Sequence, residues 1–333
     1  MIGRTAGDSA AMTSEGSIEG ESSGGGRAGV DPVAYAFLGM MILITSTTAT
    51  AAKVAVRELP TGLIPLIRFG TAGLVLLPLV WRSGAFRRMF RLDRGRLLLT
   101  AALCVPINQT FFLNGTKLAP TTHVALIYAA CPLVVLALAT AIGQERPSSG
   151  RLMSVLASMA GVAVIALGNL GDRSPEGRDA LLGDLLEVFA VTSWGAYLTV
   201  GKPLVARYGS LPTLAATFLV GAALDLPIAA ATTGDWSALG SVSPGAWKAL
   251  GYLVLIPSIA GLLFQNLALR RLESSQVATF GNVAPLLTML WGHLLFGERL
   301  TPALALGGAL VMLGLLGASR PVGRAVVAPE PAA

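Results

Sequence analysis

Ten stretches of this chain are apolar over about 20 residues each, which is the length that an α-helix needs to cross a bilayer. Three of them carry one or two charges: 61–81, 181–201 and 211–231. The others carry none: 33–52, 97–116, 118–144, 152–171, 249–269, 274–297 and 300–319. Backbone in lipid must satisfy its own hydrogen bonds, so the spans are helices or strands of a closed barrel. Barrel strands alternate over about ten residues. These runs are longer and apolar all round, so we predict an all-α polytopic membrane protein with ten transmembrane helices.

The composition excludes the soluble classes of protein. Only 13% of the 333 residues are charged and 53% are hydrophobic, whereas a soluble domain carries about 25% charged residues. The sequence contains no phosphate-binding Gly-x-x-x-x-Gly-Lys-Ser/Thr loop and no nucleophile or metal motif. We therefore expect no cofactor, no metal, no nucleotide or nucleic-acid partner and no enzymatic activity. The expected partners are a small-molecule solute and membrane lipids, and the sequence is compatible with a monomer or a homodimer.

The basic residues predict the orientation. If the N-terminus is inside, about two thirds of the 24 Lys and Arg residues fall in cytoplasmic segments. The strongest support for this orientation comes from six arginines in one segment, from Arg82 to Arg96. We thus expect a multi-pass protein of a bacterial-type inner (plasma) membrane with both termini cytoplasmic. Residues 1–30 resemble a disordered tail, and 320–333 form a polar C-terminal tail.

The chain repeats itself at an offset of about 150 residues. Residues 123–146 read HVALIYAACPLVVLALATAIGQER, and 276–299 read QVATFGNVAPLLTMLWGHLLFGER. The prolines Pro132 and Pro285 stand 13 residues before a glutamate in both copies. Each half holds five spans, an odd number, so the second half enters the membrane from the opposite side. We predict two inverted five-helix repeats, 33–170 and 181–318, an architecture typical of transporters.

Several of these motifs resemble those of the drug/metabolite transporter superfamily, EamA-type branch. They are Pro65-x-x-Arg68-Phe69 in the second span, the proline followed by Gly-x-Glu-Arg or Gly-Glu-Arg in spans four and nine, Lys53 and Lys202 after spans one and six, and Trp194-Gly195-x-Tyr197. The resemblance covers about 33–318. It implies a ten-helix transporter whose central cavity is lined by helices one to four and six to nine, with helices five and ten at the periphery.

Polar, aromatic and proline residues inside the spans are the candidates for substrate binding. Amides cost less in a membrane than charges and can bind polar groups of a solute, although bonding between helices is an equal alternative. Pro132 and Pro285 lie near mid-membrane and should free the carbonyls of Tyr128 and Gly281 toward a central site. The candidate cavity residues are Asn108, Gln109, Asn114, Tyr128, Pro132, Trp194, Tyr197, Gln265, Asn266, Asn282 and Pro285.

Three charges lie inside spans, where they are expensive. Arg68 lies in span two, Glu187 in span six and Asp225 in span seven. They could bind substrate, couple transport to protons or neutralise one another for folding. We expect Arg68 to pair with Glu187 or Asp225, because an unpaired arginine at that depth would cost roughly 2.5–3.5 kcal/mol on insertion scales.

The sequence thus predicts a secondary transporter, an exporter of a small metabolite, amino-acid-like or drug-like solute that works by alternating access. The alternatives are a passive channel and a membrane-embedded lipid-modifying enzyme. Inverted repeats with prolines inside the spans favour a transporter over a channel. The enzyme would need a nucleophile or metal constellation, and the sequence shows none.

Overall fold

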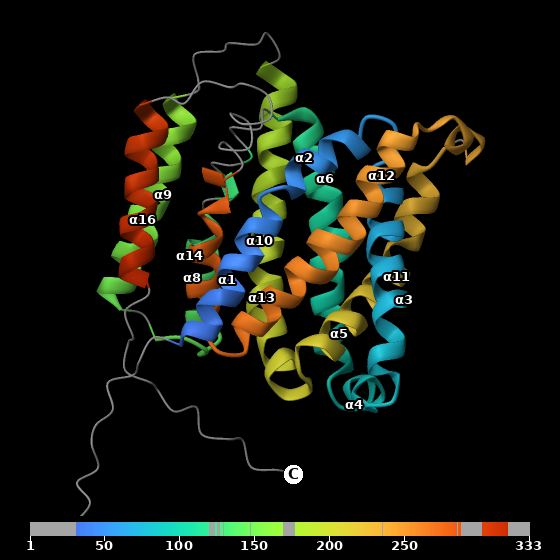
Figure 1. Cartoon of the computed structure of the whole chain (residues 1–333), viewed down its shortest axis with the longest axis horizontal. Helices are drawn as coiled ribbons and strands as arrows, with labels where there is room; N and C mark the ends of the chain where they lie inside the picture. Colours follow the sequence, from blue (N-terminus) through green and yellow to red (C-terminus); the bar gives the residue numbers. More distant parts are fainter. Residues whose placement is uncertain are drawn as a thin grey trace, which may run out of the picture.

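The computed structural model is a bundle of helices (Figure 1). It describes residues 31–119, 124, 127–128, 130–146, 148–168, 177–234, 236–284, 286–287 and 302–318, and no strand occurs among them. Pro285 and the two predicted tails, 1–30 and 320–333, lie outside the described residues. The prediction of an all-α fold is confirmed.

The first half of the chain contains α1 (Pro32–Thr45), α2 (Thr48–Ala55), α3 (Leu63–Trp81), α4 (Ala85–Leu92), α5 (Arg94–Ala102), the π-helix η1 (Leu103–Ile107), α6 (Asn108–Leu118), α8 (Cys131–Ala141) and α9 (Ser149–Gly168). The second half contains α10 (Gly177–Tyr208), α11 (Ser210–Thr232), the 3-10 helix η2 (Trp236–Ser241), α12 (Pro244–Leu253), the π-helix η3 (Val254–Gly261), α13 (Leu262–Leu269), α14 (Ser274–Gly281) and α16 (Pro302–Ala318).

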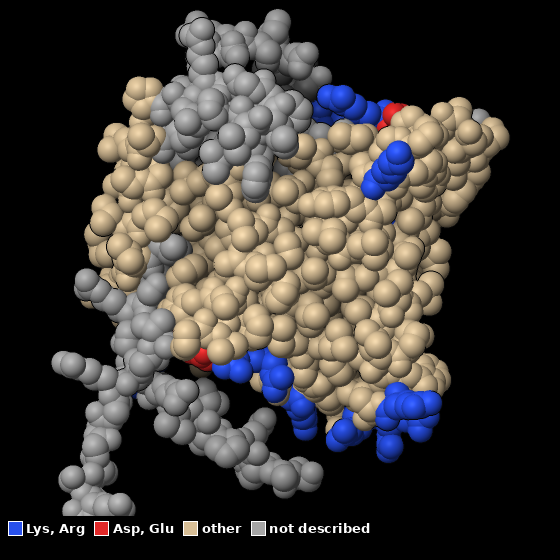
Figure 2. Space-filling model, viewed as in Figure 1, with Lys and Arg blue, Asp and Glu red and all other residues tan. Residues whose placement is uncertain are grey.

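Six helical segments among the described residues are long and apolar enough to cross a membrane: Pro32–Ala52, Leu63–Trp81, Arg94–Leu118, Leu181–Tyr208, Ser210–Thr232 and Pro244–Leu269. The four other spans of the ten-helix arrangement contain α8, α9, α14 and α16. The surface agrees with a membrane protein, because Lys and Arg gather at two opposite ends of the visible face and the described surface between them is uncharged (Figure 2).

Contacts between helix ends show that corresponding segments of the two halves run in opposite directions. Asp31, which caps the start of α1, pairs with Arg271, just past the end of α13. Arg207, at the end of α10, pairs with Asp93, just before α5. At the opposite face, Glu58 follows α2 and accepts hydrogen bonds from Ser243, the N-cap of α12. Thus α1 begins where α10 ends, and α5 begins at the face where α13 ends (Figure 1).

The helices α9 and α16 pack against each other at the edge of the bundle (Figure 1). Gly161 permits the contact, because a Cβ atom there would lie 2.4 Å from the carbonyl oxygen of Gly307 and 2.6 Å from the nitrogen of Val311. A Cβ atom at Gly314 would likewise lie 2.6 Å from the carbonyl oxygen of Ser154 and 2.7 Å from the nitrogen of Ser158. Small residues let membrane helices approach closely. The helices α9 and α16, in the fifth and tenth spans, therefore lie together at the periphery of the bundle (Figure 1).

Candidate functional site

Arg68 lies on α3 in the middle of the bundle and is only 5% exposed. Its Nε atom donates to the hydroxyl of Ser258 at 2.6 Å, and Nη1 donates to Oε1 of Gln109 at 3.3 Å. The guanidinium also lies 4.8 Å from the ring centroid of Phe69, a cation–π distance. Arg68 of the first repeat thereby contacts η3 of the second repeat directly.

The expected ion pair of Arg68 with Glu187 or Asp225 is wrong. Within the described ranges, the hydrogen-bond partners of Arg68 are neutral and no carboxylate pairs with it. One reason is that Arg68 and Glu187 contact α6 at different positions. Arg68 contacts Gln109, whereas Glu187 contacts Thr116, which lies seven residues or about 10 Å further along the helix. The sequence places both charges inside spans, but it does not show how the spans are set against one another.

Asn108 connects Arg68 and its partner Gln109 to helix α10 of the second repeat. Its Oδ1 accepts from Nε2 of Gln109 at 2.8 Å. Its Nδ2 donates to the carbonyl of Ala190 at 2.8 Å, with longer contacts to Ser193 Oγ at 3.4 Å and to the hydroxyl of Tyr128 at 3.5 Å. Asn108, Gln109, Ser258 and Arg68 are all buried. We call these four residues, with Tyr128 and Ser193, the central polar network, and all of them except Tyr128 lie on α3, α6, η3 or α10.

Two π-helices position this network. Pro106 lies in η1 and Pro257 lies in η3, in corresponding spans of the two repeats. A proline inside a helix has no N–H and removes a regular hydrogen bond, so a wider turn relieves the clash. Asn108 directly follows η1, and Ser258 lies within η3. Such π-turns often occur at functional sites, because they redirect neighbouring side chains.

A second group of buried polar side chains lies beside Arg68. Cys104 of η1 interacts electrostatically with Arg68 and lies at hydrogen-bonding range of Tyr197, and Tyr197 in turn lies next to Gln265 of α13. Gln265 is 4% exposed and its amide lies at hydrogen-bonding range of the Tyr197 hydroxyl, although its Nε2 atom makes no bond of good geometry within the described part of the chain. Oδ1 of Asn266 is likewise buried without a donor among these residues. Trp194 is half-buried and packs its ring against Tyr197.

Glu187 and Asp225 are both completely buried. Oε1 of Glu187 accepts from the hydroxyl of Thr116 at 3.0 Å, and Oε2 has no donor among the described residues. Gly115 makes room for this carboxylate, because a Cβ atom there would lie 2.7 Å from Oε1. Neither oxygen of Asp225 has a donor within the described ranges. Buried carboxylates without a cationic partner tend to bind a proton.

Two predicted cavity residues lie apart from the central polar network. Asn114 donates to the carbonyl of Thr110 one turn earlier and accepts from Thr61, outside the network. Asn282 is buried at the end of α14 and donates to Ser158 of the peripheral helix α9 at 2.8 Å. Both lie on helix faces that the sequence could not assign.

The sequence suggested that Pro132 lies inside a continuous helix, and the structure shows that it does not. It occupies the first turn of α8, which begins at Cys131, and Ala130 before it is in a turn that bonds to the carbonyl of Ile127. The first turn of a helix tolerates proline, because its N–H would be unpaired there. The span is broken at the proline rather than kinked, and the corresponding helix α14 also ends, at Gly281, shortly before Pro285.

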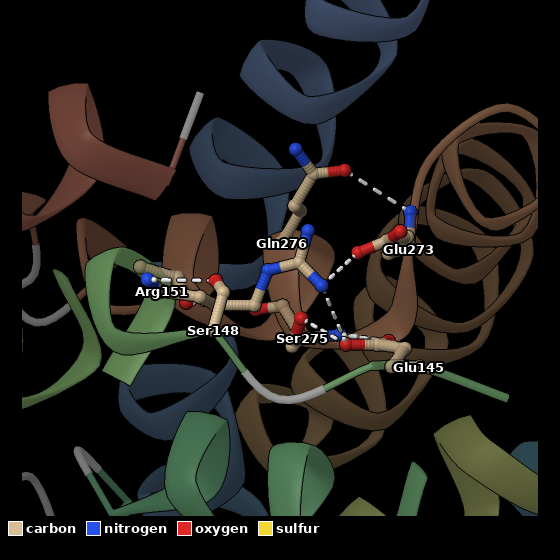
Figure 3. A network of polar contacts seen from close by, with 7 residues as sticks. Glu145, Ser148, Arg151, Glu273, Ser275 and Gln276 are labelled. Carbon is tan, nitrogen blue, oxygen red and sulfur yellow. Dashed lines mark hydrogen bonds and ion pairs between the residues drawn. The ribbon is translucent and has the colours of Figure 1, made fainter. Parts of the chain in front are cut away.

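A polar network that the sequence analysis missed joins the two halves at the face where α1 begins (Figure 3). Glu145 accepts from the N–H of Ser275 at 3.1 Å and from its hydroxyl. Arg151 of α9 pairs with Glu145 at 3.4 Å and also with Glu273. Burial raises the pKa of Glu273, and the positive charge of Arg151 opposes this effect. We call it the Glu145 network: Glu145, Ser148, Arg151, Glu273, Ser275 and Gln276.

Comparisons with known proteins agree with this architecture. The model of the EamA-like transporter family matches residues 32–167 and 181–320. The uncharacterized transporter YyaM of Bacillus subtilis (strain 168) is 24% identical over 279 residues, 83% of this chain and 90% of that protein. A probable terminal-alkyne amino-acid exporter of Streptantibioticus cattleyicolor is 26% identical over 284 residues, 83% of this chain and 91% of that protein. A solved crystal structure shares the fold with a TM-score of 0.70 and 20% identity, over 86% of this chain and 96% of that one.

Proposed function

We propose that this chain, which belongs to the EamA-like transporter family, is a secondary transporter that exports a small amino-acid-like solute by alternating access. The observation that carries the proposal is the central polar network. It is buried, it lies in a protein with an uncharged belt, and it joins α3 and α6 of one repeat to η3 and α10 of the other. Buried polar groups in a membrane protein typically mark the path of a substrate.

Alternating access requires two halves that move against each other around a site between them. The proposed halves are 33–170 and 181–318, with the central polar network at their interface. The Glu145 network closes one face of that interface, since it ties α8 and α9 to α14. When this face opens, the bonds of the Glu145 network break. The central polar network is made of other residues and does not depend on those bonds.

The choice of an amino-acid-like solute rests on the similar exporter whose name states its substrate class. The chain resembles that protein over nearly the whole length of both. The central polar network also suits such a solute, because amide, hydroxyl and guanidinium groups can bind polar ends while Phe69 and Tyr197 border them with apolar surface.

We propose that protons drive the transport and that Glu187 carries them. Glu187 lies between α6 and α10, so its protonation would bias the packing of one repeat against the other. The groups that face it are Thr116, the carboxylate of Asp184 and the phenol of Tyr128. Asp225 is the second candidate, because it is equally buried and lacks a donor among the described residues.

We further propose that the protein lies in a bacterial plasma membrane with both termini cytoplasmic. A reporter fused within 84–95 should then be cytoplasmic, and one within 234–244 should be external. A cytoplasmic signal from the second fusion would reject this orientation.

The transport proposal is tested with proteoliposomes of the purified chain, loaded with the standard L-amino acids and L-propargylglycine, a terminal-alkyne amino acid. Mass spectrometry of the external buffer follows each compound with and without a pH gradient. We expect selective release of a subset of them, faster with the gradient. Equal leakage of all compounds from loaded and protein-free vesicles would contradict the proposal.

A further inference from the structure

The geometry points to a binding site for an anionic phospholipid at α4, the short helix that follows α3. The site combines exposed arginines on and beside α4 with exposed apolar side chains at the end of α3. This inference concerns the lipid that surrounds the protein, and it does not depend on the proposed transport function.

The helix α4 lies at the end of a membrane span and packs against α3. The apolar helix α3 ends at Trp81, and Arg82 follows it directly. Gly84 has a φ of 66°, which glycine adopts without strain, and it turns the chain into α4. Figure 1 shows α4 end-on where α3 is upright, so α4 lies across the end of the bundle. Trp81 is 70% exposed, and tryptophan at the end of a span typically marks the level of the lipid headgroups.

Burial shows that α4 is amphipathic. Ala85 and Met89, one turn apart, are buried against the bundle. Arg87 and Arg91, also one turn apart, are exposed on the opposite side of the helix. Phe90 lies between these two faces and is 41% exposed. A helix with one apolar face and arginines on the other is typical of helices that lie in the plane of a membrane surface.

Most arginines around α4 lack an acidic partner. Residues 82–96 contain six arginines and one acidic residue, Asp93. Asp93 pairs with Arg96 at 4.0 Å and with Arg207 at 3.0 Å. The five other arginines are exposed and form no ion pair within the described part of the chain. We call them the α4 arginines: Arg82, Arg87, Arg88, Arg91 and Arg94. Figure 2 shows basic side chains gathered at the end of the bundle where Figure 1 places α4.

The positive-inside rule accounts for basic residues in this segment but not for their arrangement. A loop of any conformation satisfies the rule, because it depends on the number of Lys and Arg residues near the spans. Here the arginines stand on a folded helix that the second repeat holds in place. Asp93, at the end of α4, accepts hydrogen bonds from Arg207 and from the hydroxyl of Tyr208. A fixed set of donors binds a ligand at a lower entropic cost than a flexible loop does.

The combination of charge and apolar surface selects the ligand. Arginine forms paired, charge-assisted hydrogen bonds with phosphate oxygens. A phosphate bound at Arg82 lies beside Trp81, and acyl chains that extend from it into the bilayer run along Trp81 and Leu79, which is 68% exposed. Clusters of about four to eight basic residues at the end of a span typically bind anionic lipids. The site therefore fits a phospholipid with a net negative charge.

The test titrates lipid onto the full chain, purified in detergent, and counts the bound lipid by native mass spectrometry. The probes are phosphatidylglycerol and phosphatidylcholine with the same acyl chains. Phosphatidylglycerol carries a net negative charge, whereas phosphatidylcholine carries none. We expect phosphatidylglycerol to bind about tenfold or more tightly, because several arginines attract its charge. Equal binding of the two lipids overturns the inference.

Two triple variants with the same change in net charge assign this preference to α4. The α4 variant removes three charges from one helix: Arg87→Gln, Arg88→Gln and Arg91→Gln. The control removes three exposed charges from other segments: Arg57→Gln, Arg146→Gln and Arg270→Gln. The α4 variant should lose the preference for phosphatidylglycerol, and the control should keep it. If the α4 variant does not fold, Arg91→Gln alone serves instead and should reduce the preference several-fold. An undiminished preference in the α4 variant, or an equal loss in both triple variants, refutes the site.

Two further measurements distinguish a lipid from a free phosphate. Glycerol 3-phosphate carries the charge without acyl chains, and an excess of it should not displace phosphatidylglycerol. Trp81→Ala should weaken the binding of phosphatidylglycerol several-fold, because it removes apolar surface next to Arg82. Trp236→Ala, at a 52% exposed tryptophan of η2, is the matched control and should leave the binding unchanged. Displacement by glycerol 3-phosphate, or unchanged binding in the Trp81→Ala protein, overturns the assignment to a lipid.

Discussion

The carboxylate of Glu145 accepts hydrogen bonds from both the backbone N–H and the hydroxyl of Ser275, 130 residues further along the chain. Glu145 follows α8 and Ser275 begins α14, so this contact holds corresponding spans of the two repeats together at one face (Figure 3). The side chain of Glu145 is fully buried, and Arg151, 4% exposed, balances its charge.

Arg151→Ala should destabilise the protein strongly. It removes the cation that forms an ion pair with the buried carboxylate of Glu145, and removal of one partner of a buried pair costs about 3–5 kcal/mol. Thermal unfolding of the detergent-solubilised protein measures the loss. Arg146→Ala is the matched control, since Arg146 is an exposed arginine in the same segment and should change little. Equal melting temperatures for the two variants would show that the Glu145 network does not hold the halves together.

Glu187→Gln should abolish transport driven by a pH gradient and leave the folded protein intact. Glutamine keeps the size of the side chain and a hydrogen bond with Thr116, but it cannot exchange a proton. The measurement is solute flux into or out of proteoliposomes with and without the gradient. Asp184→Asn, one turn earlier on α10 and half-buried, should retain the response. An unchanged response in the Glu187→Gln protein would leave this residue with a structural role only.

Gly161→Ala should separate α9 from α16. The added methyl group meets backbone atoms of Gly307 and Val311, which cannot rotate away, and overpacking of this kind costs about 1–3 kcal/mol. The control is Gly150→Ala in the first turn of α9, where a Cβ atom meets nothing within 4 Å. The first variant should lower the melting temperature and the second should keep or raise it. Equal effects would mean that α9 and α16 are not in close contact.

Glu58→Gln should remove one part of the pH dependence of stability. The hydrogen bonds from Ser243 lower the pKa of Glu58 below its ordinary value of 4.5, so the ionised carboxylate stabilises the fold. This contribution is complete above the ordinary pKa and is lost as the pH falls through the lower pKa of the folded protein. The wild type should therefore unfold at a higher temperature than Glu58→Gln near pH 7, and the gap should close in acid. A gap that widens in acid would reject this assignment.

The spans, their order and the inverted repeat could be predicted from the sequence because each depends on local properties. Apolar length sets a span, and the recurrence of a proline thirteen residues before Glu145 and Glu298 sets the repeat. Asn108 and Gln109 were predicted as cavity residues, and that they are buried follows because polar residues in an apolar run face protein rather than lipid.

The partners of those residues could not be predicted, because they depend on how helices are set against one another. Arg68 was expected to pair with a carboxylate, but its hydrogen-bond partners are Ser258 and Gln109. The span that contains Pro132 was expected to be kinked, but it is broken before the proline. One sequence feature could have pointed to Ser258. It follows Pro257, which occupies a span that corresponds to the span of Pro106 in the first repeat. Glu145 belongs to the repeated Gly-x-Glu-Arg motif, and only the fold shows that it meets Ser275.

The most direct test of the account is a counterflow measurement on the wild-type protein. Proteoliposomes are loaded with a high concentration of the amino acid that the export assay selects, and uptake of a radiolabelled trace of the same compound is followed. A carrier with alternating access predicts transient accumulation of the label above its external concentration, because loaded sites return faster than empty ones. Uptake that only approaches equilibrium, at the same rate in loaded and empty vesicles, would contradict the account and indicate a channel.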